Sequence, residues 1–167
     1  MKLTRRDMIV SGLASTGLAK PVLAAAPKEI GWDDLIPPGV PYAEIIGEGN
    51  LDEANDSWSP IFDKNATKLN EALNGAYVRL PGFVLPLEMG AKGVTDFVLV
   101  PYVGACIHTP PPPPNQLIFA QTKKPWPSEE LWAPVWVVGT MYTRLQTTEI
   151  AETGYALKVD SMEIYEW

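Results

Sequence analysis

The stretch Tyr77-Val78-Arg79-Leu80-Pro81-Gly82-Phe83-Val84-Leu85-Pro86-Leu87 decides the fold. Apolar side chains recur on both sides of Pro81-Gly82, a pattern typical of one strand that bends at a bulge. Turn residues follow at 90–93, and the strongly apolar segment 94–103 predicts a second strand. We therefore expect these two segments to form a hairpin.

Three further segments have strand patterns, and turn signals separate them. In the last of them Tyr155, Leu157 and Val159 alternate with more polar residues. Five antiparallel strands, the first of them bent, predict a mainly β fold, a small five-stranded barrel of the oligonucleotide/oligosaccharide-binding (OB) type. An open sandwich is the alternative. The three segments are 115–120, 135–143 and 155–167.

The residues before the barrel divide into three parts. Residues 1–26 are set apart as a signal peptide, and 27–59 are polar, acidic and rich in Gly, Asn and Asp, which predicts an extended arm. Apolar residues at roughly helical spacing over 60–73, followed by Asn74-Gly75, predict one short helix. The barrel domain is therefore expected to span 60–167.

The N-terminus has the features of an export signal. A basic head containing Arg5-Arg6 precedes a mildly apolar run and a small-residue tail. The paired arginines and the weak hydrophobicity favour the twin-arginine route, with an ordinary secretory signal as the alternative. We expect cleavage near Ala24 to Ala26 and residence in the periplasm, without stable membrane insertion because the run is short.

The composition limits the possible partners. The chain has 167 residues, 46% of them hydrophobic, which suffices for the core of one domain. Loss of residues 1–26 removes four of 13 basic and one of 20 acidic residues, leaving a formal charge of −10. A protein this acidic, whose basic residues cluster only at Lys123-Lys124, is a poor partner for nucleic acid.

The lone cysteine and the lone histidine of the chain lie two residues apart, at Cys106 and His108. On an extended strand these side chains share a face, and thiolate plus imidazole suits zinc or copper. Two ligands do not complete a site, and Glu88, Asp96, Met89 and Met141 are residue types that could add to it. The pair therefore predicts a metal site, with a buried structural thiol and imidazole as the alternative.

A thiol-dependent enzyme is a second interpretation of the same pair. His108 would lower the pKa of Cys106, and the thiolate would attack a carbonyl or a peroxide. On a regular strand the two side chains run parallel about 6 to 7 Å apart, too far for a direct hydrogen bond. Enzymatic activity is therefore not favoured.

Five consecutive prolines, 110–114, follow this pair and suggest a third interpretation. A polyproline II segment is stiff and cannot continue a sheet, so it can project as a rod. Pro111, Pro112 and Pro113, together with an exposed Trp126, would then dock onto an envelope partner. The alternative for Trp126 is a place tucked over the barrel mouth.

Three segments of the chain resemble a family of exported bacterial proteins, domain-of-unknown-function family 3299. These segments are 32–37, 80–88 and 101–115, the last with its Cys-x-His and polyproline motif. The resemblance implies a signal-bearing envelope protein, often encoded beside ABC-type transporter components, some of them linked to zinc supply. It implies no activity. Because no cysteine ends the signal, a lipid anchor is not expected.

Together these observations predict an exported periplasmic binding or accessory protein. They leave its precise role open: one candidate is metal handling through Cys106 and His108, in association with an ABC-type transporter or another envelope protein. The alternative is an interaction module that docks through the polyproline loop and binds no metal.

Overall fold

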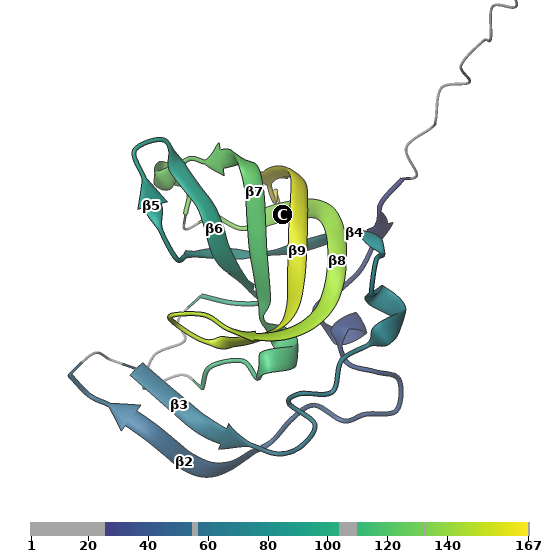
Figure 1. The fold of residues 1–167 in the computed structure, drawn as a ribbon, viewed down its shortest axis with the longest axis vertical. Helices are drawn as coiled ribbons and strands as arrows, with labels where there is room; N and C mark the ends of the chain where they lie inside the picture. Colours follow the sequence, from purple (N-terminus) through teal and green to yellow (C-terminus); the bar gives the residue numbers. More distant parts are fainter. Residues whose placement is uncertain (1–25, 55–56, 104–109, 132, 167) are drawn as a thin grey trace, which may run out of the picture.

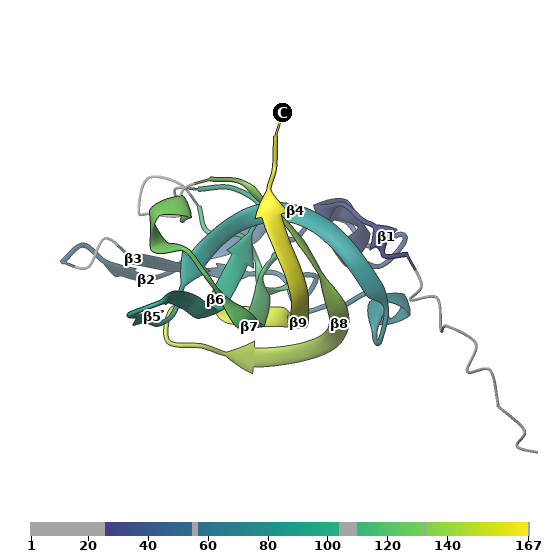
Figure 2. The ribbon, with the colours of Figure 1, turned by 90° about the horizontal axis from the view of Figure 1, so that it is seen from above.

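A computed structural model of the chain describes residues 26–54, 57–103, 110–131 and 133–166 (Figures 1 and 2). Nearly all of its regular structure is β, in agreement with the expected fold class. The strands are β1 (Lys28–Glu29), β2 (Ile45–Asp52), β3 (Ser57–Phe62), β4 (Tyr77–Pro86), β5 (Met89–Gly90), β6 (Gly93–Val100), β7 (Ile118–Trp126), β8 (Val135–Thr147) and β9 (Glu152–Ile164). Short 3-10 turns are η1 (Trp32–Leu35), η2 (Glu71–Leu73), η3 (Pro114–Gln116) and η4 (Ser128–Glu130).

Five strands close into a barrel. Its order is β4-β8-β9-β7-β6, and β6 pairs back onto β4. Neighbours are antiparallel except β7 and β9, which are parallel. The expectation of a purely antiparallel barrel is wrong in this one pairing, because directions cannot alternate all the way around a ring with an odd number of strands. The five-stranded barrel itself is confirmed, and the order and directions are those of an OB-type barrel.

Strand β4 closes the barrel by changing partner partway along its length. Tyr77 to Gly82 pair with β8, and Phe83 to Pro86 pair with β6. A side chain on Gly82 would place its Cβ 2.9 Å from both Leu99 Cγ and the Val100 oxygen. The bend foreseen at Pro81-Gly82 therefore exists, and Gly82 permits it because β6 passes so close.

The barrel interior is filled by the apolar side chains that alternate along these strands. Val78 and Leu80 of β4, Phe97 of β6 and Tyr155 of β9 are fully buried there. The outward side of β6 carries a second apolar cluster in which Val98, Val100 and Leu117 pack beneath Phe83, Leu87 and Ala151. This cluster covers the outer face of β6 and leaves β7, β9 and β8 as the open side of the barrel.

The N-terminal part is more ordered than the sequence suggests. Within the expected arm, β1 pairs in parallel with β4, and Trp32 Nε1 donates a 2.8 Å hydrogen bond to the Pro81 oxygen. Strands β2 and β3 form a separate two-stranded sheet, drawn apart from the barrel in Figure 1. The helix expected over 60–73 is reduced to η2, because the start of that segment pairs in β3.

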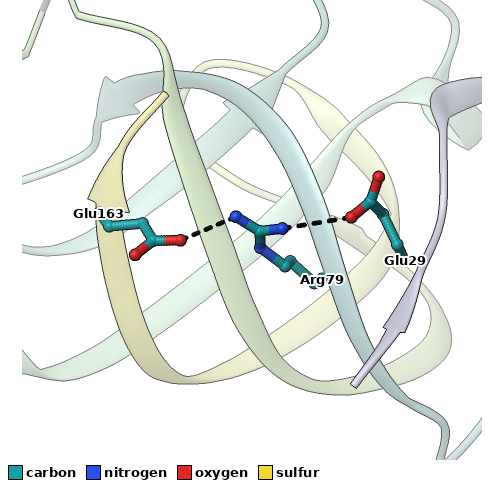
Figure 3. A network of polar contacts seen from close by, with 3 residues as sticks. All are labelled: Glu29, Arg79 and Glu163. Carbon is teal, nitrogen blue, oxygen red and sulfur yellow. Dashed lines mark hydrogen bonds and ion pairs between the residues drawn. The ribbon is translucent and has the colours of Figure 1, made fainter. Parts of the chain in front are cut away.

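One arginine ties three strands together on the outside of the barrel. Arg79 of β4 forms ion pairs with Glu29 of β1 at 3.2 Å and with Glu163 of β9 at 2.8 Å (Figure 3). Its guanidinium also lies 3.9 Å from the ring centre of Trp136 in β8. The network fixes the N-terminal strand against the barrel.

Across the described residues, no helix is long and apolar enough to span a membrane.

Candidate ligand groove on the barrel

Cys106 and His108 lie outside the described residues, so the predicted metal pair stays a prediction. Within the described ranges, no three His, Cys, Asp or Glu side chains gather as a metal site would require. Of the additional ligands considered, Met141 is fully buried in the core. Asp96 accepts hydrogen bonds from Gln121 at 2.5 Å and from Thr95 at 2.8 Å.

The polyproline segment packs against the body of the protein. Pro112 and Pro113 are buried, Pro111 is half-buried and Pro110 is exposed. Asn115 anchors the end of the segment, because its side-chain nitrogen donates to the oxygens of Asn65 and Lys68 at 2.9 and 3.1 Å. A partner that reaches this segment would therefore touch Pro110 and Pro111 first.

Trp126 is not exposed, contrary to the expectation. It retains 8% of its accessible surface and belongs to the main core cluster. Its indole nitrogen donates a 3.4 Å hydrogen bond to the Glu130 oxygen in η4. The alternative reading, a tryptophan tucked into the end of the barrel, describes its place.

A groove of about 750 Å³ runs across β7, β9 and β8. Its floor follows from strand register. Phe119 of β7 lies opposite Ala156 of β9, and Ala156 lies opposite Tyr142 of β8. A small side chain therefore stands between two aromatic ones, which are two strand spacings, roughly 10 Å, apart. That gap is wide enough to admit a flat ring above Ala156.

A second row of side chains beside this floor is polar. Gln121 of β7 lies opposite Lys158 of β9, and Asp96 of β6 lies opposite Gln121. Because the amide nitrogen of Gln121 donates to Asp96, its oxygen remains as an acceptor. The row presents an ammonium and an amide oxygen side by side.

The other side chains that line the groove include hydroxyl, amide and basic groups. Thr143 donates from its hydroxyl to Glu71 at 2.8 Å, and its backbone nitrogen donates to the Asn74 side chain at 3.3 Å. Lys123 and Arg144 are exposed and line the groove together with Lys158. Within the described part of the chain, Arg79 is the basic residue that forms ion pairs, so these three cations remain available.

Sequence reasoning missed this groove. Ala156 and Lys158 alternate along β9 in the sequence, but their neighbours depend on the parallel pairing with β7 and on the register of the antiparallel pairing with β8. A smaller hollow of about 350 Å³ lies beside the polyproline segment, where Trp58, Pro111 and Ile150 are among the lining residues. The predicted docking segment therefore borders a cavity here.

Three tyrosines have altered acidity, all outside the groove. Burial raises the pKa of Tyr155 to about 12, with a smaller upward effect of Glu71 opposed by the hydrogen bond from Asn70. Burial, Tyr102 and Asp33 raise the pKa of Tyr42 to about 12. Burial also raises the pKa of Tyr102, whose hydroxyl donates to the Pro110 oxygen at 2.8 Å. All three phenols are therefore neutral at physiological pH.

Comparisons with known proteins agree on one family. The profile of a family described as protein of unknown function (DUF3299) matches residues 32–164. A crystal structure of a DUF3299 family protein from Pseudomonas aeruginosa PAO1 is 36% identical in sequence, with a TM-score of 0.70. The match covers 86% of this chain and 99% of that one. No curated protein matches the chain.

Proposed function

This chain belongs to the DUF3299 family, and we propose that it is an exported binding protein of the bacterial envelope. Its ligand occupies the groove over β7, β9 and β8. The observation that carries the proposal is the placement of Ala156 between Phe119 and Tyr142. Ligand sites are concave, partly aromatic and supplied with a few convergent polar groups, and this groove combines all three.

The fold supports a binding role at this side of the barrel. OB-type barrels bind extended ligands on their outer sheet surface. Here Leu87 and Ala151 cover β6, so the open surface moves to the neighbouring strands β7, β9 and β8. Phe119 and Asp96 connect the groove with the surface that such barrels commonly use.

Export is supported by residues 1–26, whose basic head, mild apolar run and small-residue tail are those of a signal peptide. The proposed location is the periplasm, after cleavage near Ala24 to Ala26. The partner we propose is an ABC-type transporter or another envelope protein that receives the ligand.

Filling the groove tests the proposal. Native mass spectrometry of the exported protein should detect a bound small molecule in the wild type and none in Ala156→Phe. Ala91→Phe is the matched control, because Ala91 is exposed in the β5–β6 turn outside the groove. Equal occupancy in wild type and Ala156→Phe, or an empty wild type, would reject the groove as the binding site.

Metal handling is the second candidate, and the Cys106-x-His108 pair favours it. Both residue types prefer zinc or copper, and a thiolate–imidazole pair could hold such an ion with ligands from a partner. Elemental analysis of the exported protein, isolated without a tag or chelator, tests this. Near-stoichiometric metal that disappears in Cys106→Ser is expected, and metal-free wild type counts against it.

A further inference from the structure

We infer that the ligand of the groove is an anionic saccharide, a sugar that carries a carboxylate or a phosphate. The inference rests on the proposed function and specifies its ligand. It follows from three features of the groove: its charge relative to the rest of the protein, the density of hydrogen-bonding side chains, and the aromatic side chains beside Ala156.

The charge of the groove is opposite to that of the protein. The chain after residue 26 has a formal charge of −10, yet the groove is lined by Lys123, Arg144 and Lys158 and by a single carboxylate, Asp96. Asp96 is engaged by Gln121 and Thr95, and nearby Glu71 is engaged by Thr143. None of the three cations forms an ion pair within the described residues, and they outnumber Asp96, so they can attract an anion while the acidic surface around the groove repels it.

The three cations lie on different strands around the floor. Lys123 extends from β7, Arg144 from β8 and Lys158 from β9. Lys158 lies opposite Gln121, and this pair is two residue pairs from Phe119–Ala156 along the same two strands, on the same face of the sheet. An acidic group near Lys158 would therefore leave the rest of the ligand above Ala156. Arg144 can bind a carboxylate or phosphate through two parallel hydrogen bonds.

The remaining lining suits a hydroxylated ring. Amide side chains can both donate to and accept from sugar hydroxyls, and the hydroxyls of Thr122 and Thr143, which already donate to Lys124 and Glu71, can accept. The aromatic rings of Phe119 and Tyr142 offer apolar surface for the ring itself. These amide and hydroxyl residues are Asn74, Gln121, Thr122, Thr143 and Gln146.

Calorimetric titration of the exported protein with two pairs of saccharides tests the inference. The pairs are tetragalacturonate with its fully methyl-esterified form, and a phosphorylated maltotetraose with maltotetraose. We expect one charged member to bind at least about tenfold more tightly than its neutral partner, as for a hydrogen bond to a charged group. The charged member that binds identifies the acidic group as carboxylate or phosphate.

Substitutions in the groove assign the effect to its cations. Lys158→Gln and Arg144→Gln should each weaken binding of the charged sugar by about tenfold or more. Lys64→Gln, an exposed lysine outside the groove, should leave it unchanged. Because Lys158 and Arg144 are exposed, both variants should fold.

Failure of the inference is distinguishable from failure of the proposed function. Equal binding of charged and neutral sugars, abolished by Ala156→Phe, would overturn the anionic ligand and retain the groove as a binding site. Charged sugars that bind equally to wild type and Ala156→Phe would overturn both. If none of the four sugars binds, and the wild-type protein also carries no ligand on isolation, both the anionic ligand and the groove as a binding site are overturned.

Discussion

The hydroxyl of Tyr155, in β9, donates a 2.5 Å hydrogen bond to the backbone oxygen of Leu35, 120 residues earlier in the chain. The same hydroxyl accepts a 2.6 Å hydrogen bond from the Asn70 nitrogen. One buried phenol therefore joins the barrel to η1 and to the cap of η2. This connection places the N-terminal segment on the barrel.

Tyr155→Phe should destabilise the protein. The exchange leaves the Leu35 oxygen and the Asn70 nitrogen without this partner, which costs about 1–3 kcal/mol of unfolding free energy. Urea denaturation followed by tryptophan fluorescence measures the loss. Tyr142→Phe, an exposed tyrosine of β8, is the matched control and should change stability little. Equal stability of wild type and Tyr155→Phe would contradict this account of the contact.

Stability should fall at alkaline pH, in part because of Tyr155. Its pKa rises from 10.0 to about 12 in the folded state, so folding favours the neutral phenol. The free energy of unfolding that this pKa shift contributes is complete below pH 10 and is lost as the pH rises towards 12. Unfolding free energy measured between pH 9 and 12, at about half-unit steps, should decline less steeply in Tyr155→Phe than in wild type. Parallel curves would exclude Tyr155 as a source of the decline.

Gly82→Ala should destabilise the bend of β4. The added Cβ would lie 2.9 Å from Leu99 Cγ and from the Val100 oxygen, so β4 and β6 must separate. Overpacking of this kind costs about 1–3 kcal/mol. Gly31→Ala is the control, because its Cβ would meet Asp34 at 3.9 Å. Thermal unfolding followed by circular dichroism compares the two, and equal midpoints would argue against a close approach at Gly82.

Arg79→Met should loosen β1. Its ion pairs with Glu29 and Glu163 involve carboxylates that are 64% and 62% exposed, so solvent screens them. With the contact to Trp136, the total effect should be about 1 kcal/mol. Hydrogen exchange at Ile30, whose nitrogen donates to the Arg79 oxygen, should accelerate. Unchanged exchange would mean that backbone pairing alone holds the strand.

Asn115→Ala should loosen the contact of the polyproline segment with 65–68, where the backbone hydrogen bond from Asn115 to the Ala66 oxygen remains. The buried amide donates to two backbone oxygens, and its loss should cost about 1–3 kcal/mol. Asn50→Ala, an exposed position in β2, should be nearly neutral. Denaturant midpoints of the two variants test the difference, and similar values would place the anchor elsewhere.

The sequence predicts the barrel because its signals are local. Alternation around Tyr155 and the interruption at Pro81-Gly82 identify strands and a bend from neighbouring residues alone. The parallel pairing of β7 with β9 is not local, since it results from closing five strands into a ring. Likewise β3 overrides the helical spacing of 60–73, because Ile61 and Phe62 pair with β2 instead.

The candidate site was far less predictable. Cys106 and His108 stand out in the sequence because each is the single residue of its type, whereas the groove is built from residue types that occur many times in the chain. Its floor depends on Ala156 having Phe119 on one side and Tyr142 on the other, a relationship that only register reveals. Trp126 shows the same limit, because its burial depends on strands that are distant in sequence.

The central claim is that the groove over β7, β9 and β8 holds the ligand, and residue-resolved NMR tests it most directly. The isotopically labelled exported protein would be titrated with tetragalacturonate and, separately, with phosphorylated maltotetraose. The account predicts that the largest amide shifts for the sugar that binds fall at Gln121, Tyr142, Ala156 and Lys158. Largest shifts outside these strands, or no shifts with either sugar, would contradict it.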